Sequence, residues 1–193
     1  MGHWSRFCLE FFLSTKIVIK GSENLIRNEK FFIACSHQSM FETFFLQTIF
    51  NSPIFILKKE LLSIPIFGVY LKKIGSISID RDRTTKENLG FIEKIKTSVS
   101  SKRPIIIFPQ ATRMTPEDRT PFKKGVSRIY KNLEIKCQPV AINSGYVWPK
   151  NGSLKLNKLI TVSILKPIEP GIGPNDFIEI IEKKIYSELD LLN

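Results

Sequence analysis

Blocks of apolar and polar residues follow one another along the chain in a pattern that predicts strands and helices in turn. Short runs rich in β-branched and aromatic residues, each closed by a turn or polar residue, are typical of buried strands and occur at 16–20, 31–35, 53–57, 76–79, 104–108, 137–142 and 159–165. Helices are predicted at 39–50, 84–101, 123–133 and 176–189, with broken helical pieces at 60–62 and 67–73. In 84–101 the apolar residues fall at three- and four-residue spacing, the pattern of an amphipathic helix. The alternation of strands and helices predicts an α/β fold with a largely parallel central sheet flanked by helices.

The length of 193 residues suits one domain with a full core. We expect that domain at 16–193, after an amphipathic segment at 1–15. Trp4, Phe7, Cys8, Phe11 and Phe12 fall at roughly helical spacing in this segment, which either lies on a bilayer surface or packs on the domain core. No run approaches the roughly 20 apolar residues of a membrane span, so we expect no transmembrane helix.

The charge of the chain indicates its class of partner, and its cysteines indicate the redox compartment and whether a metal site is present. The chain has 29 lysines and arginines against 18 acidic residues, a net charge of +11 that attracts phosphate-bearing partners: nucleotides, nucleic acids or anionic lipids. Cys8, Cys35 and Cys137 are scattered, and neither they nor His3 and His37 have metal-ligand spacing. We therefore expect a reducing compartment and no metal site.

Polar residues follow four of the predicted strands at their carboxyl ends, where ligands collect in α/β folds. These clusters are His37 with Glu42, Asp80 with Arg81, Thr112 with Arg113, and Asn143 with Ser144. Their positions predict one shared site.

His37 and Glu42 form the pair best suited to catalysis. Ser39 and Glu42 fit a capping box with Ser39 as N-cap, so His37 precedes the helix and can fold back toward the acid. A carboxylate that accepts a hydrogen bond from one ring nitrogen leaves the other nitrogen free to act as a general base. Two other readings stay open: Glu42 only completes the capping box, or His37 is only a polar strand end. No serine elbow is present, and Cys35 alternates with buried positions, so we expect a substrate hydroxyl to be the nucleophile.

Several cationic side chains are candidates to hold a phosphate, because guanidinium forks and ammonium groups match its oxygens. They are Lys58, Lys59, Arg81, Arg113 and Lys124. Thr112 adds a hydroxyl donor. The alternative for each lysine is a solvated surface charge, and Arg81 can instead pair with a neighbouring aspartate.

Four blocks, in order, resemble those of bacterial lysophospholipid acyltransferases of the 1-acyl-sn-glycerol-3-phosphate acyltransferase type. The blocks are residues 36–43 (SHQSMFET), 75–81 (GSISIDR), 108–113 (FPQATR) and 138–145 (QPVAINSG). The resemblance extends from about residue 16 to the C-terminus, and the first block is similar to the family branch that reads His-Gln-Ser with Glu as the acid. Each block alone is weak, but four in order are specific.

The resemblance implies a glycerolipid acyltransferase-like fold and transfer of a fatty acyl group from acyl-coenzyme A or acyl carrier protein to the free hydroxyl of lysophosphatidic acid, giving phosphatidic acid. His37 would be the base and Glu42 would orient it. Phosphate binding would fall to Arg81, Thr112 and Arg113, assisted by Lys58 or Lys59. Further expected substrate contacts are Ser39, Gln110, Lys124, Asn143 and Ser144.

This reading also predicts the partners and location of the protein. We expect no cofactor beyond the acyl thioester, no nucleic acid, and a peripheral or monotopic place on an anionic membrane surface, at the cytoplasmic face of the inner membrane. Acyl carrier protein is a further possible partner.

The third block departs from the family's usual Glu-Gly, because this chain has Gln110 and Ala111. A neutral amide replaces a carboxylate, and alanine adopts a positive φ less easily than glycine. This departure leaves the acceptor open: lysophosphatidic acid is the expected one, glycerol-3-phosphate or a lyso-aminolipid is the alternative, and weaker activity is a further possible consequence. A non-catalytic nucleic-acid-binding domain is a remote alternative, since the chain has no recognised aromatic-basic RNA motif.

Overall fold

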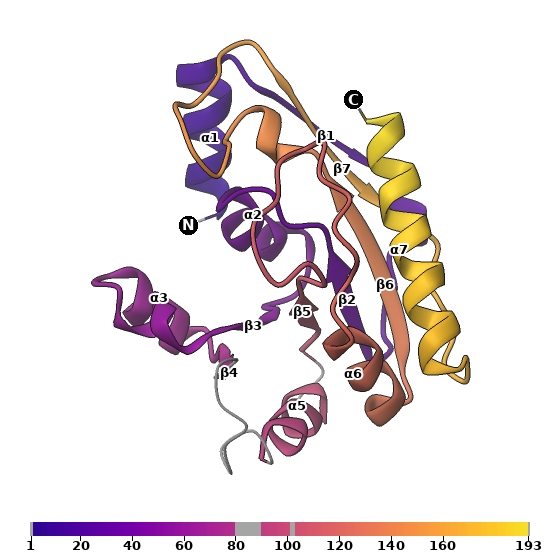
Figure 1. Ribbon diagram of the computed structural model, residues 1–193. Coiled ribbons are helices and arrows are strands. Elements are labelled where there is room, and N and C mark those ends of the chain that lie inside the picture. The colour runs from indigo at the N-terminus through magenta and orange to yellow at the C-terminus, as the bar shows by residue number, and fades with distance from the viewer. Residues whose placement is uncertain (1, 80–89, 101–102, 193) are drawn as a thin grey trace.

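A central sheet separates two layers of helices (Figure 1). In the computed structural model, which describes residues 2–79, 90–100 and 103–192, seven strands form this sheet in the order β1-β7-β6-β2-β5-β3-β4. The strands are β1 (Lys16–Lys20), β2 (Phe31–Cys35), β3 (Ile54–Lys58), β4 (Ile77–Ile79), β5 (Ile105–Ile107), β6 (Lys136–Ile142) and β7 (Leu159–Ile164). Neighbouring strands are parallel except for β6 and β7. The predicted α/β fold with a largely parallel sheet is confirmed.

Helices cover both faces of the sheet, as Figure 1 shows with α2 and α7 on opposite sides. One face carries α1 (Gly2–Leu13), α2 (Phe41–Ile49) and α3 (Phe67–Lys73); the other carries α5 (Phe91–Ser100), α6 (Gly125–Leu133) and α7 (Pro174–Leu191). Short 3-10 turns are η1 (Ser22–Asn24), η2 (Lys59–Ser63) and η3 (Ser144–Tyr146). Strand β2 is apolar at every position because both of its faces are covered by helices. Ile33 faces the α2 layer, Phe32 faces the α7 layer, and both are fully buried.

The position of β2 at the middle of the sheet determines where the polar clusters lie. Ile33 pairs with Ile106 of β5 on one side and with Gln138 of β6 on the other, and both pairings are parallel. The carboxyl ends of these three strands therefore meet at one edge, together with the polar clusters that follow them. The cluster of Asp80 and Arg81 falls outside the described residues.

Three helices start two residues away from the predicted position: α2, α6, which begins at Gly125 instead of 123, and α7. Helix α2 begins at Phe41 with Met40 at the N-cap, so Ser39 lies one residue before the cap. Helix α7 begins at Pro174, which places Asp176, a possible N-cap from its residue type, inside the first turn. Proline suits the first helical position because its fixed φ is helical and its missing N–H has no partner there anyway. Of the helix predicted at 84–101, residues 84–89 and 101 lie outside the described residues.

The N-terminal helix packs on the domain core and also exposes aromatic side chains that suit a bilayer surface. Leu9 of α1 is buried in the core cluster that includes α2, whereas Phe7, Phe11 and Phe12 are exposed. Among the described residues, no helix is both long enough and apolar enough to cross a membrane.

Candidate active site

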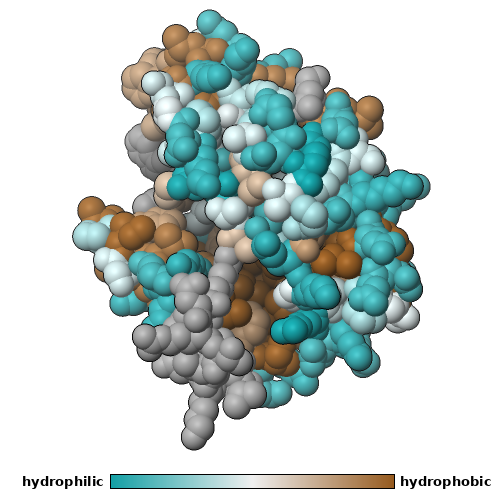
Figure 2. All heavy atoms as spheres, viewed as in Figure 1, coloured by the Kyte–Doolittle hydropathy of each residue, from teal (hydrophilic) through white to brown (hydrophobic). Residues whose placement is uncertain are grey.

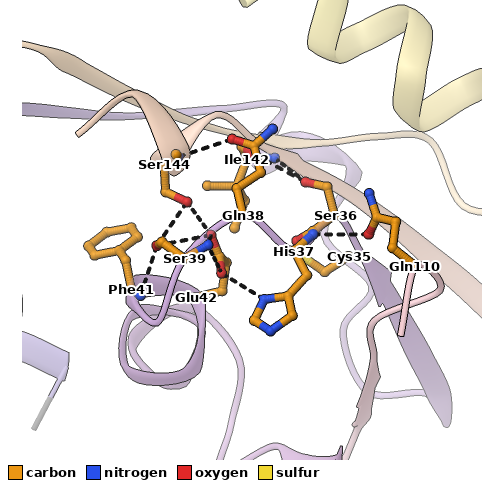
Figure 3. A network of polar contacts seen from close by, with 11 residues as sticks. Cys35, Ser36, His37, Gln38, Ser39, Phe41, Glu42, Gln110, Ile142 and Ser144 are labelled. Atoms are coloured by element: carbon orange, nitrogen blue, oxygen red, sulfur yellow. Dashed lines mark hydrogen bonds and ion pairs between the residues drawn. The ribbon is translucent and has the colours of Figure 1, made fainter. Parts of the chain in front are cut away.

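His37 follows the carboxyl end of β2, and its ring contacts Glu42, as Figure 3 shows, and also Phe108. Its Nδ1 lies 2.9 Å from Oε2 of Glu42, and the ring stacks on Phe108 with the centroids 4.0 Å apart and the planes 16° apart. A carboxylate only accepts hydrogen bonds, so this contact places the proton on Nδ1 and leaves Nε2 as the acceptor. The His37 side chain keeps 17% of its surface exposed, which lets a substrate reach it.

Glu42 is a fully buried carboxylate whose oxygens are all engaged. Besides His37, they accept hydrogen bonds from the backbone N–H of Ser39 at 3.0 and 3.1 Å and from the Ser39 hydroxyl at 3.3 Å. The Ser144 hydroxyl also donates to Oε1 (Figure 3). Glu42 thus closes the first helical turn and holds His37 at the same time, so the capping and orienting readings do not exclude each other.

Ser39 and Ser144 support the carboxylate from the side away from His37. Their hydroxyls lie 3.1 Å apart, and both residues are fully buried. The Ser39 hydroxyl also accepts the N–H of Phe41 at 3.0 Å, which satisfies one donor of the helix start although Met40 occupies the cap. Both serines were expected to contact substrate; the structure places them against Glu42.

The backbone of His37 is fixed by the chain that follows β5. Its N–H donates to Oε1 of Gln110 at 3.1 Å, and its carbonyl accepts the N–H of Met114 at 2.8 Å. Gln110 is almost fully buried, so its amide, at a position where the resemblance implied a carboxylate, bonds to the protein itself. The Tyr186 hydroxyl donates to the carbonyl of Thr120 at 2.5 Å, and burial, the largest cause, raises the pKa of Tyr186 to about 12, although an interaction with Gln110 lowers it. The phenol therefore stays protonated in this network.

Removing the Gln110 side chain is expected to destabilise the protein. Gln110→Ala leaves the His37 N–H buried without its acceptor, which lowers the free energy of unfolding by about 1–3 kcal/mol. Chemical denaturation measures the difference, with Gln110→Glu as the matched control because it keeps an acceptor oxygen at the same place. Equal midpoints for wild type and Gln110→Ala would show that this bond does not hold the backbone of His37.

A cavity of about 220 Å³ opens beside His37 and is also lined by Lys58, Thr112 and Arg113. Most of its other lining residues are apolar: Phe55, Ile56, Leu57, Leu61, Phe67, Leu71, Phe108 and Ala111. A second, more apolar cavity of about 480 Å³ shares Ile56, Phe108 and Ala111 with it. Figure 2 shows a hollow with hydrophobic lining in this part of the surface, next to α6.

The remaining candidates lie elsewhere. Lys59 is exposed in η2 and Lys124 is exposed before α6, and neither lines the cavity at His37. Asn143 is buried, with its amide nitrogen donating to the carbonyl of Leu192 at 2.8 Å and its oxygen accepting the N–H of Thr161 at 2.7 Å. Asn143 thus ties β6 to β7 and the end of α7. Arg81 lies outside the described residues.

Ala111 has a backbone conformation that its residue type did not suggest. Its φ is +64°, in the left-handed region, and its N–H bonds the carbonyl of Phe108 at 2.9 Å. The turn after β5 therefore keeps a positive φ without glycine, at a cost of about 1–2 kcal/mol. Alanine disfavours this conformation, as expected, but the turn adopts it nonetheless, and the hydrogen bond from Ala111 to Phe108 helps to hold it there.

Cys35 is not placed or charged to act as a nucleophile. It is fully buried, and burial, followed by the charge of Glu42, raises the pKa of its thiol. Deprotonation is therefore disfavoured. Within the part of the chain that the structure describes, no group of three histidine, cysteine or acidic side chains is arranged to hold a metal ion.

Phe108 is a site residue that the sequence pattern did not single out. It stacks on His37 and lines both cavities. In the sequence it is the last apolar residue of the run before Pro109, which is indistinguishable from a core position. Two signals were available: its place at a strand end beside a polar cluster, and its position as the first residue of the 108–113 block.

Comparison with known proteins identifies the family. The family model described as Acyltransferase matches residues 16–143. A 1-acyl-sn-glycerol-3-phosphate acyltransferase of Pseudomonas aeruginosa is 30% identical over 94% of this chain and 72% of its own, and one of Helicobacter pylori is 34% identical over 95% and 78%. The crystal structure of the 1-acyl-sn-glycerophosphate acyltransferase PlsC from Thermotoga maritima has the same fold, with a TM-score of 0.81 at 22% identity over 99% of this chain and 77% of that one. The chain therefore belongs to the Acyltransferase family and is an acyltransferase.

Proposed function

We propose that this acyltransferase transfers a fatty acyl group from acyl-coenzyme A or acyl carrier protein to the free hydroxyl of lysophosphatidic acid, giving phosphatidic acid for phospholipid synthesis. The names of the relatives support this acceptor. The observation that carries the proposal is the His37–Glu42 pair, at 2.9 Å, on a cavity that Arg113 also lines. One cavity thus offers a base and a cation to an acceptor that carries both a hydroxyl and a phosphate.

His37 acts as the general base in this mechanism. Its Nε2 takes the proton of the acceptor hydroxyl while the oxygen attacks the thioester carbonyl. The tetrahedral intermediate collapses with loss of the thiolate, and the proton held by His37 passes to that leaving group. Glu42 stabilises the imidazolium between these steps, and its buried hydrogen bonds keep it fixed in place.

The cationic and hydroxyl groups of the cavity bind the acceptor phosphate. Arg113 supplies a guanidinium, Thr112 a hydroxyl and Lys58 an ammonium group, and all three line the same cavity as His37. Arg81 and Lys59 remain predicted contributors. Because Gln110 bonds the backbone of His37 and does not line this cavity, its difference from the family's glutamate leaves the cavity wall unchanged.

The proposal includes a peripheral place on an anionic membrane surface at the cytoplasmic face of the inner membrane, where a lysophospholipid is available. The net charge of +11 favours such a surface and both anionic substrates. Acyl carrier protein, itself a possible donor, is the expected protein partner.

A panel of acceptors with one acyl thioester tests this function. Lysophosphatidic acid is expected to react faster than glycerol-3-phosphate, a lyso-aminolipid, or monoacylglycerol, which lacks the phosphate. Arg113→Ala is expected to lower kcat/KM for lysophosphatidic acid by about 10–100-fold, the effect of losing a charged hydrogen bond of about 1.5–3 kcal/mol. Its effect on monoacylglycerol should be small.

Lys183→Ala is the matched control, because Lys183 is an exposed cation on α7, outside the lining of the cavity. It should behave as wild type with every acceptor. Equal rates for lysophosphatidic acid and monoacylglycerol, unaffected by Arg113→Ala, would contradict the phosphate site.

A further inference from the structure

Exposed apolar side chains gather on the segment between β3 and β4. Ile66 is 80% exposed and Val69 is 67% exposed, and Leu61 and Ile64 are exposed beside them. Figure 2 shows this group as hydrophobic surface over α3, at the left of the view. We call Leu61, Ile64, Ile66 and Val69 the apolar ridge. Four exposed aliphatic side chains within nine residues are unusual for a surface that faces only water.

The backbone holds Ile66 outward under strain. Its φ of +64° and ψ of −54° put it at the centre of a γ-turn, in which the N–H of Phe67 bonds the carbonyl of Pro65 at 2.6 Å. This turn is strained for any residue and more so for a β-branched one. Gly68 fixes the geometry, since a Cβ there would lie 2.2 Å from the carbonyl oxygen of Leu62. An exposed isoleucine in a strained turn points to a function of the side chain.

Positive charge borders the apolar ridge. Lys72 and Lys73 are exposed in the last turn of α3, and Lys59 is exposed in η2. Glu60 is the acidic residue among them, and it lies 3.3 Å from the ammonium group of Lys58. Apolar side chains flanked by lysines match an anionic bilayer surface, where the aliphatic groups enter the interface and the ammonium groups meet lipid phosphates.

The apolar ridge also adjoins the active site. Leu61 belongs both to the ridge and to the lining of the cavity at His37, and Phe67 and Leu71 of the same segment line that cavity too. The ridge lies on the helical layer that contains α1, whose phenylalanines at positions 7, 11 and 12 are exposed as well. Lipid bound at the ridge would therefore lie next to the opening through which an acceptor reaches His37.

We propose that the apolar ridge, with Lys72 and Lys73, docks the protein on an anionic lipid bilayer and places the cavity at the level of the lipid headgroups. The delivery of an acceptor from the bilayer rests on the proposed function, whereas the docking itself does not. An acyl carrier protein, which is acidic and carries an acyl chain, is the alternative partner for the ridge, and the test must distinguish it from the bilayer.

Co-sedimentation with vesicles of phosphatidylethanolamine and phosphatidylglycerol tests the docking. The double variant Ile66→Asn, Val69→Ser keeps the net charge and uses exposed positions, so it is expected to fold normally and to bind these vesicles about tenfold more weakly. Leu191→Asn is the matched control, because Leu191 is 77% exposed on α7 in the opposite helical layer and should leave binding unchanged. Lys72→Gln with Lys73→Gln should weaken binding only to vesicles that contain phosphatidylglycerol.

Activity assays separate the docking from the proposed function. With lysophosphatidic acid embedded in vesicles, the ridge variant should lose turnover in proportion to binding; with a short-chain acceptor below its micelle concentration, it should match wild type. Equal vesicle binding by the ridge variant and wild type would overturn the docking. If the ridge variant instead lost binding to acyl carrier protein while its vesicle binding stayed unchanged, the ridge would be a site for that protein and not for the bilayer. A wild type that binds vesicles through the ridge but acylates neither acceptor would support the docking and refute the proposed function.

Discussion

His37→Ala is expected to lower kcat for acylation of lysophosphatidic acid by at least about 10²–10⁴-fold, the usual contribution of a positioned general base. The variant removes the nitrogen that accepts the hydroxyl proton, and no described residue replaces it next to the cavity. KM for the acceptor should change little, because Arg113 and Thr112 still line the cavity. Steady-state kinetics with one thioester and one acceptor measure both constants.

The loss should not come from unfolding. The ring is partly exposed and contacts Glu42 and Phe108, while the backbone bonds of His37 to Gln110 and Met114 remain in the variant. Thermal unfolding should therefore shift by only a few degrees. Activity within threefold of wild type, in a protein that unfolds normally, would remove His37 from the mechanism.

Glu42→Gln is expected to lower kcat by about 10²-fold, with a smaller change in KM. The amide can keep its oxygen toward the donors of Ser39 and Ser144 only if its nitrogen faces His37. Nδ1 must then accept a hydrogen bond, which moves the proton to Nε2 and blocks the nitrogen that should act as base. Nitrogen-15 NMR of the imidazole measures this exchange of tautomers directly.

Glu182→Gln is the matched control for Glu42→Gln. Glu182 is a partly buried carboxylate that accepts the N–H of Phe122 at 2.6 Å, on α7 and without contact to His37. It should leave kcat and the tautomer of His37 unchanged. If Glu42→Gln keeps the wild-type tautomer and rate, Glu42 serves only to close the helix.

The hydrophobic pattern was sufficient to predict the strands and a largely parallel sheet, but not the strand order or the antiparallel pair of β6 and β7. Runs such as Phe31–Cys35 are apolar at every position because helices cover both faces, and this leaves little choice of structure. Helix starts were less predictable, since they depend on which of several polar residues the backbone uses. At α2 a serine that suits the cap lies one residue too early, and at α7 a proline begins the helix ahead of the aspartate.

The sequence predicted correctly that His37, Thr112 and Arg113 line one cavity. It was less informative for polar residues whose role depends on whether they are buried. His37, Thr112 and Arg113 follow strand ends that the parallel sheet brings to one edge, and the structure places all three on one cavity. Gln110 and Asn143 also follow strand ends, but both are buried and bond to backbone groups. Nothing in the sequence distinguishes a polar residue that turns inward from one that faces a substrate.

The most direct test of general-base catalysis by His37 is a single-turnover reaction in which the protein and the lipid are measured in the same sample. Purified protein in excess over an acyl thioester is mixed with lysophosphatidic acid, and the masses of intact protein and of lipid are recorded over time. We expect phosphatidic acid to form at the rate at which the thioester disappears, without an acylated protein, in wild type and not in His37→Ala. An acylated protein that forms without acceptor, or the absence of phosphatidic acid, would contradict direct transfer to the acceptor hydroxyl.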